Sequence, residues 1–227
     1  MRREPFGIGS VLHVMKRGAR GLPITKGIDD QWRFVRLLYY MNDEYKDDFW
    51  EQSTRSLGTF ERPKRWPKRK SLVKIYAWVL MPNHFHLVLE EIQDGGTSRF
   101  MQKLCGSMSV HFNLKYEEIG SLFQGPYKSR TVGRDEYFRY LIPYVMVKNV
   151  FELYLGGFDA AAQNFEEAWK WATQSYAFSC LPDYFGRQDI PIIDPTAHAM
   201  FDSPKSLKSL SKDMVLGRLE GNFFLLD

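Results

Sequence analysis

The sequence predicts an α+β domain in which helices pack on one antiparallel sheet. Two observations favour this class. Apolar residues alternate with a period of two in several short runs, and they recur at helical spacing in longer runs that are interleaved with the short ones. The composition is that of an ordinary globular protein, with 44% hydrophobic and 26% charged residues in 227, so the chain can bury a core.

The first half of the chain is expected to hold three strands and two helices. Residues 10–18 alternate like a strand, and residues 29–43 show helical spacing after an aspartate that can serve as N-cap. The strand-like runs SLVKIYAWVL and HFHLVLEE follow, separated by MPN. Pro82 and Asn83 are turn formers, so this region is either a hairpin or one continuous bent strand. Residues 97–118 then repeat apolar positions at helical spacing.

The second half is expected to be mainly helical. Residues 120–132 are punctuated by glycine and predicted to be extended. A helix begins near Asp135, and Pro143 either kinks it or restarts it at Tyr144. A further helix is expected in FEEAWKWATQSYAF. We therefore expect a domain over residues 1–183 and a helical or irregular C-terminal extension over residues 184–227.

Residues 45–70 form a basic insertion. Their last part, ERPKRWPKRK, contains two prolines that disfavour a regular helix. One interpretation is a solvated surface loop. The other is an arm that follows phosphates, with Trp66 stacking on an unpaired base.

The charge and the cysteines limit the possible functions only broadly. Net charge is +4, a mild excess that favours a polyanionic partner only slightly. The two cysteines form no CxxC motif or disulfide framework, which indicates a reducing compartment. No run approaches the roughly 20 apolar residues of a membrane span. We expect a cytoplasmic protein without a membrane partner.

Two histidines in LMPNHFHLVLE are the first candidates for a functional site. On a strand, His84 and His86 point to the same face with Cα atoms roughly 6.5–7 Å apart, so both rings can reach one divalent cation. Ordinary strand histidines with a hydrogen-bonding role are the alternative. His13 or His111 could join such a site, whereas His198 is a weaker candidate. A tyrosine could attack a phosphate held there, but twelve tyrosines are present and composition does not choose among them.

Five motifs, in order, resemble the HUH single-tyrosine transposases (transposase IS200-like), and in particular the REP-associated tyrosine transposase branch. They are HVMKRGARG, YAWVLMPNHFHLVLEE, FMQKLCGSMSVHFNLKYEEIGSLFQGPYKSRTV, DEYFRYLIPYVMVKN and WKWATQSYAF, and they span roughly residues 10–180. The resemblance implies a ferredoxin-like α+β fold, with an antiparallel sheet and helices packed on one face.

The resemblance also implies a reaction. Members of the family cut single-stranded DNA near a short imperfect hairpin, of the REP or transposon-end kind. A tyrosine hydroxyl attacks phosphorus and leaves a 5′-phosphotyrosine and a free 3′-OH, and the reverse reaction joins strands. By position, His84 and His86 would hold Mg²⁺ or Mn²⁺, and Tyr144 would be the nucleophile, in preference to Tyr137 and Tyr140. Such a protein is expected to be bacterial, DNA-associated, and a monomer or homodimer.

The sequence departs from the family in one position. Many relatives carry an amide residue four positions after the tyrosine, where it completes the metal site. Here that position is Lys148, and Asn149 follows it. Position i+5 of an α-helix is rotated by about 100° from i+4. Either a local distortion at Pro143 brings Asn149 to the metal, or another group completes the shell and Lys148 neutralises phosphate.

Several further residues are candidates for DNA contacts because they are cations, an amide or an aromatic. They are Arg17, Arg20, Arg62, Lys64, Arg65, Lys68, Arg69, Gln124, Tyr127, Lys128 and Lys148. Two functions remain open: a metal-dependent strand transferase, and a domesticated hairpin-binding protein of the same fold that no longer cuts. A metallohydrolase that uses water is less favoured, because only Glu90 would add a carboxylate to the histidine side.

Overall fold

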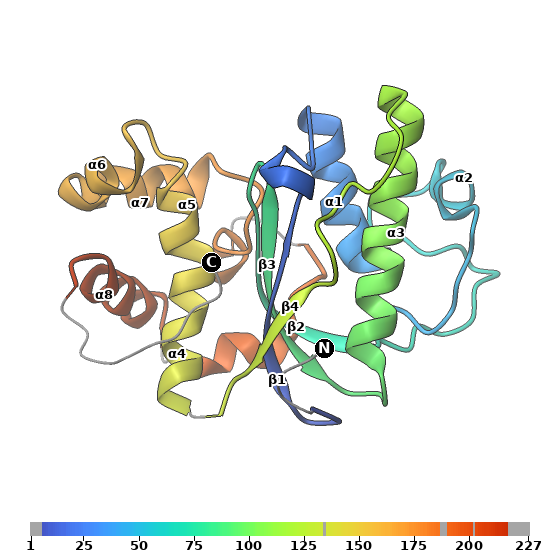
Figure 1. Cartoon of the computed structure of the whole chain (residues 1–227). Coiled ribbons are helices and arrows are strands. Elements are labelled where there is room, and N and C mark those ends of the chain that lie inside the picture. Colours follow the sequence, from blue (N-terminus) through green and yellow to red (C-terminus); the bar gives the residue numbers. More distant parts are fainter. Residues whose placement is uncertain (1–5, 134, 187–189, 202, 218–227) are drawn as a thin grey trace.

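The computed structural model describes residues 6–133, 135–186, 190–201 and 203–217 (Figure 1). Its elements are β1 (Val11–Arg17), η1 (Ala19–Gly21), α1 (Ile28–Tyr40), α2 (Trp50–Thr54), β2 (Val73–Leu80), β3 (His84–Glu91), α3 (Gly96–Tyr116), β4 (Lys128–Thr131), α4 (Asp135–Pro143), η2 (Tyr144–Lys148), α5 (Asn149–Phe151), α6 (Gly157–Gln163), α7 (Phe165–Gln174), η3 (Asp183–Phe185), η4 (Pro195–Met200) and α8 (Pro204–Val215). Among these described helices, none is long and apolar enough to cross a membrane.

The four strands form one antiparallel sheet in the order β2-β3-β1-β4. With helices α1 and α3 between β1 and β2 and between β3 and β4, this is the ferredoxin-like arrangement, so the predicted α+β class is confirmed. The MPN segment is the bend of a hairpin. Leu80 pairs with Phe85 across it, and the Met81 N–H donates to the His84 carbonyl oxygen at 2.8 Å.

The strand register places all three sheet histidines on one face. Met15 lies opposite His86, and Arg17 lies opposite His84. Directly paired residues share a face, and His13 lies two residues before Met15, so it points the same way. We call the side of the sheet that carries His13, His84 and His86 the histidine face.

Helices cover both faces of the sheet, which corrects the expectation that they pack on one. On the face opposite the histidines, Phe34 of α1 packs on Phe85, with ring centroids 5.1 Å apart. Figure 1 shows α1 and α3 on that side, and α4 and α5 on the other. The physical reason is that the histidine face is also largely apolar: Met15, Val79 and Val88 are buried there and need a cover.

The basic insertion packs beyond α1, on the side away from the histidine face. It contains one short helix, α2, and no helix over residues 61–70, as the prolines predicted. Trp66 is buried, not exposed for stacking on a base. Its ring lies 6.0 Å from the ring of Tyr40, and its Nε1 donates to Asp47 at 3.1 Å. The burial of Trp66 therefore contradicts the interpretation in which its ring stacks on an unpaired base.

The described residues after 183 pack onto the rest of the fold. The Tyr184 hydroxyl donates to the Tyr76 carbonyl oxygen at 2.7 Å, and the Asp194 N–H donates to the Ile75 carbonyl oxygen at 2.8 Å. Helix α8 contacts α4 and η2. These contacts attach the described part of the predicted 184–227 extension to β2 and to the helix that follows β4.

The helix after β4 changes geometry in the middle. Helix α4 ends at Pro143, residues Tyr144–Lys148 form a π-helical turn, and α5 continues from Asn149. Proline lacks a backbone N–H and disturbs the regular ladder, and π turns are a common form of such a disturbance. The predicted irregularity at Pro143 is therefore present, as a π turn that begins at the next residue.

Candidate active site

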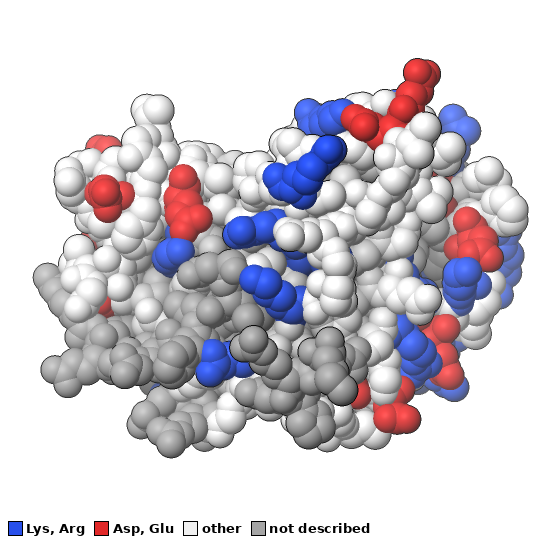
Figure 2. All heavy atoms as spheres, in the orientation of Figure 1, with Lys and Arg blue, Asp and Glu red and all other residues white. Residues whose placement is uncertain are grey.

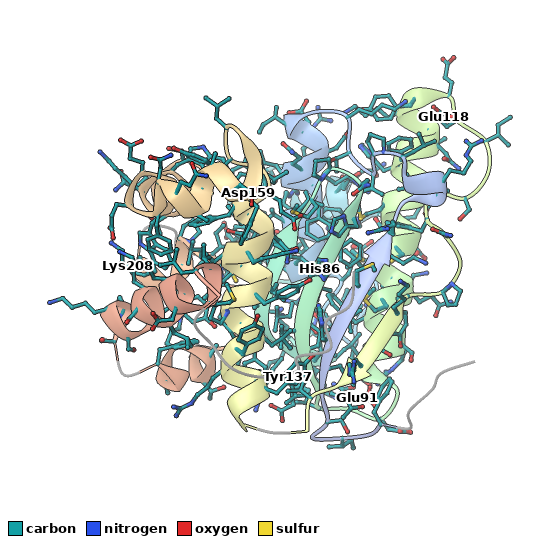
Figure 3. The ribbon with its side chains drawn as sticks, turned by 60° about the vertical axis from the view of Figure 1, so that its left-hand side comes forward. His86, Glu91, Glu118, Tyr137, Asp159 and Lys208 are labelled. Carbon is teal, nitrogen blue, oxygen red and sulfur yellow. The ribbon has the colours of Figure 1, made fainter. Side chains whose placement is uncertain are left out.

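The centre of the histidine face is a pair of stacked imidazoles. His13 Nε2 and His86 Nδ1 are 2.9 Å apart, and their ring centroids are 5.1 Å apart. Both residues are buried, with His86 1% exposed. The His84 ring lies at the more open end of the pair, 5.0 Å from the His86 ring and nearly perpendicular to it. In Figure 3, His86 lies on β3, beside helix α4, which carries Tyr137.

The pKa of His86 lies well below its usual range. Burial is the main cause, because it disfavours the charged ring, and the nearby rings of His13 and His84 and the cations Lys148 and Arg17 act in the same direction. The ring is therefore neutral at neutral pH. A neutral imidazole is the form that binds a metal ion.

Each histidine of the HxH pair uses its Nδ1 in a hydrogen bond within the protein. His86 Nδ1 contacts His13 Nε2, and His84 Nδ1 contacts Asn83 Oδ1 at 2.6 Å. If both Nδ1 atoms carry the proton, both Nε2 atoms carry the lone pair. Metal-binding histidines usually have this arrangement, in which the second ring nitrogen is held by a neighbouring group. The donor set therefore fits a divalent cation.

Tyr144 packs against the buried histidines on the histidine face. Its ring centroid is 6.0 Å from that of His13 and 6.3 Å from that of His86, and both contacts are edge-to-face. Tyr140 and Tyr137 lie about one and two turns earlier, respectively, on α4, and both are half-buried. Tyr144 itself is 2% exposed. The fold thus brings together residues that are about 60 positions apart in the sequence.

The two residues that end the π turn take different surroundings. Lys148 Nζ lies 5.3 Å from the centroid of the Tyr144 ring and pairs with Glu152 at 2.5 Å. Asn149 is buried, and its Nδ2 donates to the carbonyl oxygens of Tyr144 at 3.1 Å and Val145 at 3.2 Å. The amide is therefore held directly beside the backbone of the tyrosine.

Among the residues that the structure describes, no three side chains of His, Cys, Asp or Glu are arranged to hold a metal ion. His13 does not change this, because its Nε2 is directed at His86 and not at a point shared with His84 and His86. A cation here would have the two imidazoles of the HxH pair and oxygen atoms from an amide, water or substrate.

Residues 64–147 match the model of the family described as transposase IS200-like. The matched range is just over a third of the chain, and it contains His84, His86 and Tyr144. Residues 64–147 are therefore similar to IS200-like transposases. One similar solved structure is that of a REP-associated tyrosine transposase bound to a REP hairpin. It is 14% identical, has a TM-score of 0.44, and covers 87% of this chain and 94% of that chain. At that level the likeness carries no conclusion about what this chain binds. No curated protein matches the chain.

The residues predicted to contact DNA fall into two groups, and the first lies around the histidine face. Arg17 and Lys128 are exposed at β1 and β4, opposite His84 and Met15, respectively. Figure 2 shows lysine and arginine side chains in a row across this side of the molecule. The exposed Gln124 lies next to Arg17, since its N–H donates to the Arg17 carbonyl oxygen at 2.9 Å, the exposed Arg20 follows β1, and Lys148 lies near Tyr144. Tyr127 is half-buried, and its hydroxyl lies 3.3 Å from Ser98 of α3, on the other side of the sheet.

The second group lies on the insertion, beyond α1. Arg62 pairs with Asp43 and Arg69 lies over the ring of Tyr39 at 4.3 Å, so both stabilise the insertion. Lys64, Arg65 and Lys68 are exposed. The sheet lies between these residues and the histidine face. The sequence could not indicate this separation, because the position of the second group depends on how α1 packs.

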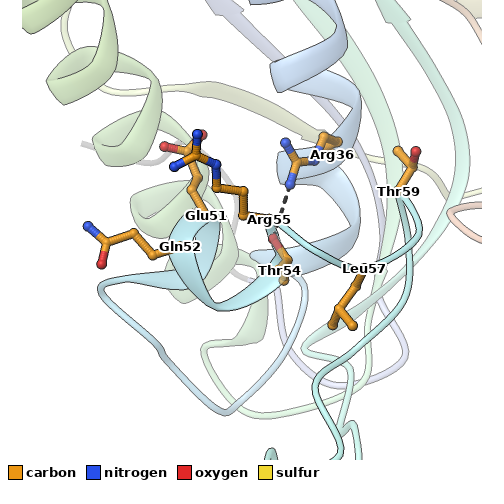
Figure 4. A pocket seen from close by; sticks show the side chains of 7 residues that line it. All are labelled: Arg36, Glu51, Gln52, Thr54, Arg55, Leu57 and Thr59. Carbon is orange, nitrogen blue, oxygen red and sulfur yellow. Dashed lines mark hydrogen bonds between the residues drawn. The ribbon is translucent and has the colours of Figure 1, made fainter.

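Cavities also lie on the insertion side. One of about 440 Å³ is bordered by Arg36 and Thr54, whose Nη2 and Oγ1 atoms are 3.1 Å apart (Figure 4). A second, of about 820 Å³, lies between the insertion and α3. His13, His84 and His86 line neither cavity.

The three histidines outside the HxH pair lie in different parts of the fold. His13, one of two considered for the site, joins it through His86. His111, the other, points away from the site and lies 3.5 Å from Asp30, which joins α1 and α3. His198 packs against Tyr184, with ring centroids 4.9 Å apart. The contact of Asn83 with His84 was not predicted, although the position of Asn83 next to the HxH pair was visible in the sequence.

Proposed function

We propose that this protein is a metal-dependent endonuclease and strand transferase that acts on single-stranded DNA near an imperfect hairpin, through a 5′-phosphotyrosine intermediate. The observation that carries the proposal is the position of Tyr144 beside His13 and His86. The match to IS200-like transposases includes His86 and Tyr144, but not His13, and supports the same conclusion. REP-like or transposon-end hairpins are the substrates that the sequence resemblance favours.

Tyr144 would act as the nucleophile. Its hydroxyl oxygen forms a bond to phosphorus, the bond between phosphorus and the 3′ oxygen breaks, and that oxygen leaves as a 3′-OH. The phenol loses one proton and the leaving oxygen gains one, so charge and atoms balance, and the phosphodiester energy is retained in the new bond. Attack by the 3′-OH on the phosphotyrosine reverses the step and joins strands.

His84 and His86 would hold a divalent cation, Mg²⁺ or Mn²⁺, through their Nε2 atoms, with Asn149 as an additional amide near the tyrosine. When bound, the cation supplies Lewis-acid polarisation of a phosphoryl oxygen. The Lys148 ammonium lies near the Tyr144 ring, and a cation in that place favours the phenolate that attacks phosphorus.

Access to Tyr144 requires a local movement. The residue is 2% exposed, so a DNA phosphate reaches its hydroxyl only after the covering side chains have moved aside. The exposed cations Arg17 and Lys128, at β1 and β4, would hold the DNA backbone on the same face. We infer that DNA binding and exposure of the tyrosine occur together.

The test is incubation with a panel of hairpin-bearing single strands and Mn²⁺, followed by a denaturing protein gel. We expect a covalent protein–DNA band with the wild type and with Tyr140→Phe, and none with Tyr144→Phe or His86→Gln. A band that persists in Tyr144→Phe would overturn the nucleophile assignment. Tight hairpin binding by the wild type, without a band for any hairpin, would favour the alternative of a binding protein that does not cut.

A further inference from the structure

Asn83, the last residue of the hairpin bend, contacts three parts of the molecule at once. Its Nδ2 donates to the Gly21 carbonyl oxygen at 3.1 Å, and its Oδ1 lies 2.6 Å from His84 Nδ1. Its own carbonyl oxygen accepts from the Gly18 N–H at 2.7 Å. The residue therefore links the turn after β1 to the first histidine of the HxH pair.

These contacts fix the direction of the amide. A carbonyl oxygen only accepts hydrogen bonds, so the atom of Asn83 that faces Gly21 must be the nitrogen. The oxygen must then face His84. Because an amide oxygen also only accepts, the neutral His84 ring must carry its proton on Nδ1, and its lone pair is on Nε2.

The surrounding backbone keeps Asn83 in place. The Ile24 N–H donates to the Pro82 carbonyl oxygen at 2.8 Å. Together with the bond from the Gly18 N–H to Asn83, this gives two backbone hydrogen bonds between the hairpin bend and the segment that follows β1. A Cβ on Gly18 would lie 2.2 Å from the Leu22 carbonyl oxygen and 3.3 Å from that of Asn83. The first distance shows how tightly the turn after β1 is folded, and the second shows that it lies directly against the hairpin bend.

We propose that Asn83 is a positioning residue, which selects the Nδ1–H tautomer of His84 and orients Nε2 as the nitrogen available to a metal ion. The partner histidine has a matching arrangement, since His86 Nδ1 is held by His13. When His13 Nε2 accepts from His86 Nδ1, both rings of the HxH pair present Nε2. A group that holds the second ring nitrogen of a metal-binding histidine typically contributes about 10- to 100-fold to metal affinity.

The first test needs neither metal nor DNA. In protein labelled with ¹⁵N-histidine, at roughly pH 8 where imidazoles are ordinarily neutral, two-bond ¹H–¹⁵N correlations distinguish the two tautomers. His84→Gln identifies the His84 signals. We expect the Nδ1–H form in the wild type and in Asn83→Asp, which keeps an acceptor. In Asn83→Leu, similar in volume but without an acceptor, we expect a shift toward the Nε2–H form.

The second test measures Mn²⁺ affinity by calorimetry and by electron paramagnetic resonance, and it rests on the proposed function. Asn83→Leu should bind Mn²⁺ about 10- to 100-fold more weakly than the wild type, and Asn83→Asp at least as tightly. Wild-type protein that binds no Mn²⁺ would reject the proposed metal role and leave the tautomer result standing.

Two results would overturn the assignment of Asn83 itself. One is a wild-type His84 in the Nε2–H form. The other is an Nδ1–H form that persists unchanged in Asn83→Leu, because the ring would then be held by another group. If Asn83→Leu does not fold, Asn83→Asp decides: loss of the Nδ1–H form there, with the acceptor retained, contradicts the proposal.

Discussion

Asn149 lies one π turn after Tyr144, and its backbone N–H donates to the Tyr144 carbonyl oxygen. Its side-chain Nδ2 donates to the same oxygen at 3.1 Å. A five-residue hydrogen bond closes one π turn, so residue i+5 stacks over residue i much as residue i+4 does in an α-helix. The π turn therefore offsets the one-residue displacement of the amide that the sequence shows.

Deletion of Lys148 tests this relationship. A π turn is equivalent to one extra residue in an α-helix, so the deletion should convert it to a regular turn and leave Asn149 beside Tyr144. We expect the free energy of unfolding to stay within about 1 kcal/mol of that of Lys148→Ala, which removes only the charge. Chemical denaturation followed by circular dichroism measures the difference.

A deletion inside the regular part of the helix is the control. Removing Leu141 from α4 rotates the neighbouring turns by about 100° relative to each other and should destabilise by several kcal/mol. An equal loss of unfolding free energy in the two deletion variants would show that the π turn does not act as an inserted residue.

The salt dependence of DNA binding should distinguish the two basic groups. The charge-neutralising substitutions Arg17→Gln and Lys128→Gln on the histidine face should each weaken binding to a hairpin with a single-stranded flank. Each should also make the slope of log affinity against log salt shallower by about 0.7 if the contact is to the single strand. Lys64→Gln and Lys68→Gln on the insertion serve as matched controls and should leave both quantities unchanged. The opposite pattern would assign the DNA contact to the insertion.

Two glycines should respond to alanine in opposite ways. A Cβ at Gly18 would meet the Leu22 carbonyl oxygen at 2.2 Å, a backbone atom that cannot rotate away, so Gly18→Ala should lose about 1–3 kcal/mol of stability. Gly106 is inside α3 with nothing within 4 Å of its Cβ position, so Gly106→Ala should gain about 0.5–1 kcal/mol. Thermal unfolding of the two variants measures this. A tolerated Gly18→Ala would mean that the turns docked around Asn83 are more adaptable than their contacts indicate.

Asp30 should make stability depend on pH below about 4. Burial acts to raise its pKa, but hydrogen bonds from Lys115 Nζ at 2.7 Å, the Tyr116 hydroxyl at 2.6 Å and the Lys26 N–H at 2.8 Å outweigh burial and lower the pKa to about 2. A carboxyl with a lowered folded pKa stabilises the fold above its unfolded pKa of about 3.9. That contribution, about 2 kcal/mol, is lost as pH falls through the folded value.

Denaturant unfolding between about pH 2 and pH 5 measures this dependence. Asp30→Asn should be less stable at neutral pH and should lose less stability than the wild type across that window. Asp29→Asn, its exposed neighbour in the first turn of α1, should behave like the wild type. If the free energy of unfolding of Asp30→Asn fell with pH as steeply as that of the wild type, other carboxyls would be responsible for the pH dependence.

Local sequence patterns predicted the strands and long helices well, because periodicity records which side of an element is buried. The alternation around His84 and His86 correctly predicted that they share a face. The choice between a hairpin and a bent strand at MPN was left open, because Pro82 and Asn83 are compatible with both. Pairing of Leu80 with Phe85 decides it, and that pairing depends on contacts between strands.

The position of the helices was predicted less well. The resemblance implies helices on one face of the sheet, whereas Met15, Val79 and Val88 make the histidine face apolar too, so a second set of helices covers it. The charge of the insertion left two interpretations open, a solvated surface loop and an arm that follows phosphates. Charge in a sequence indicates affinity for anions, but only packing against α1 determines where that charge lies.

The sequence by itself determined the α+β class, the HxH pair on one strand face, and a tyrosine helix disturbed near Pro143, because each depends on residues close together in the chain. Only the tertiary structure decided which residues meet: His13 with His86, Asn83 with both Gly21 and His84, and Tyr144 with the buried histidines. Such contacts join segments whose relative position is fixed by the packing of the whole domain. The π turn is the same kind of result, since it keeps Asn149 beside Tyr144 despite a spacing that an ideal α-helix would not allow.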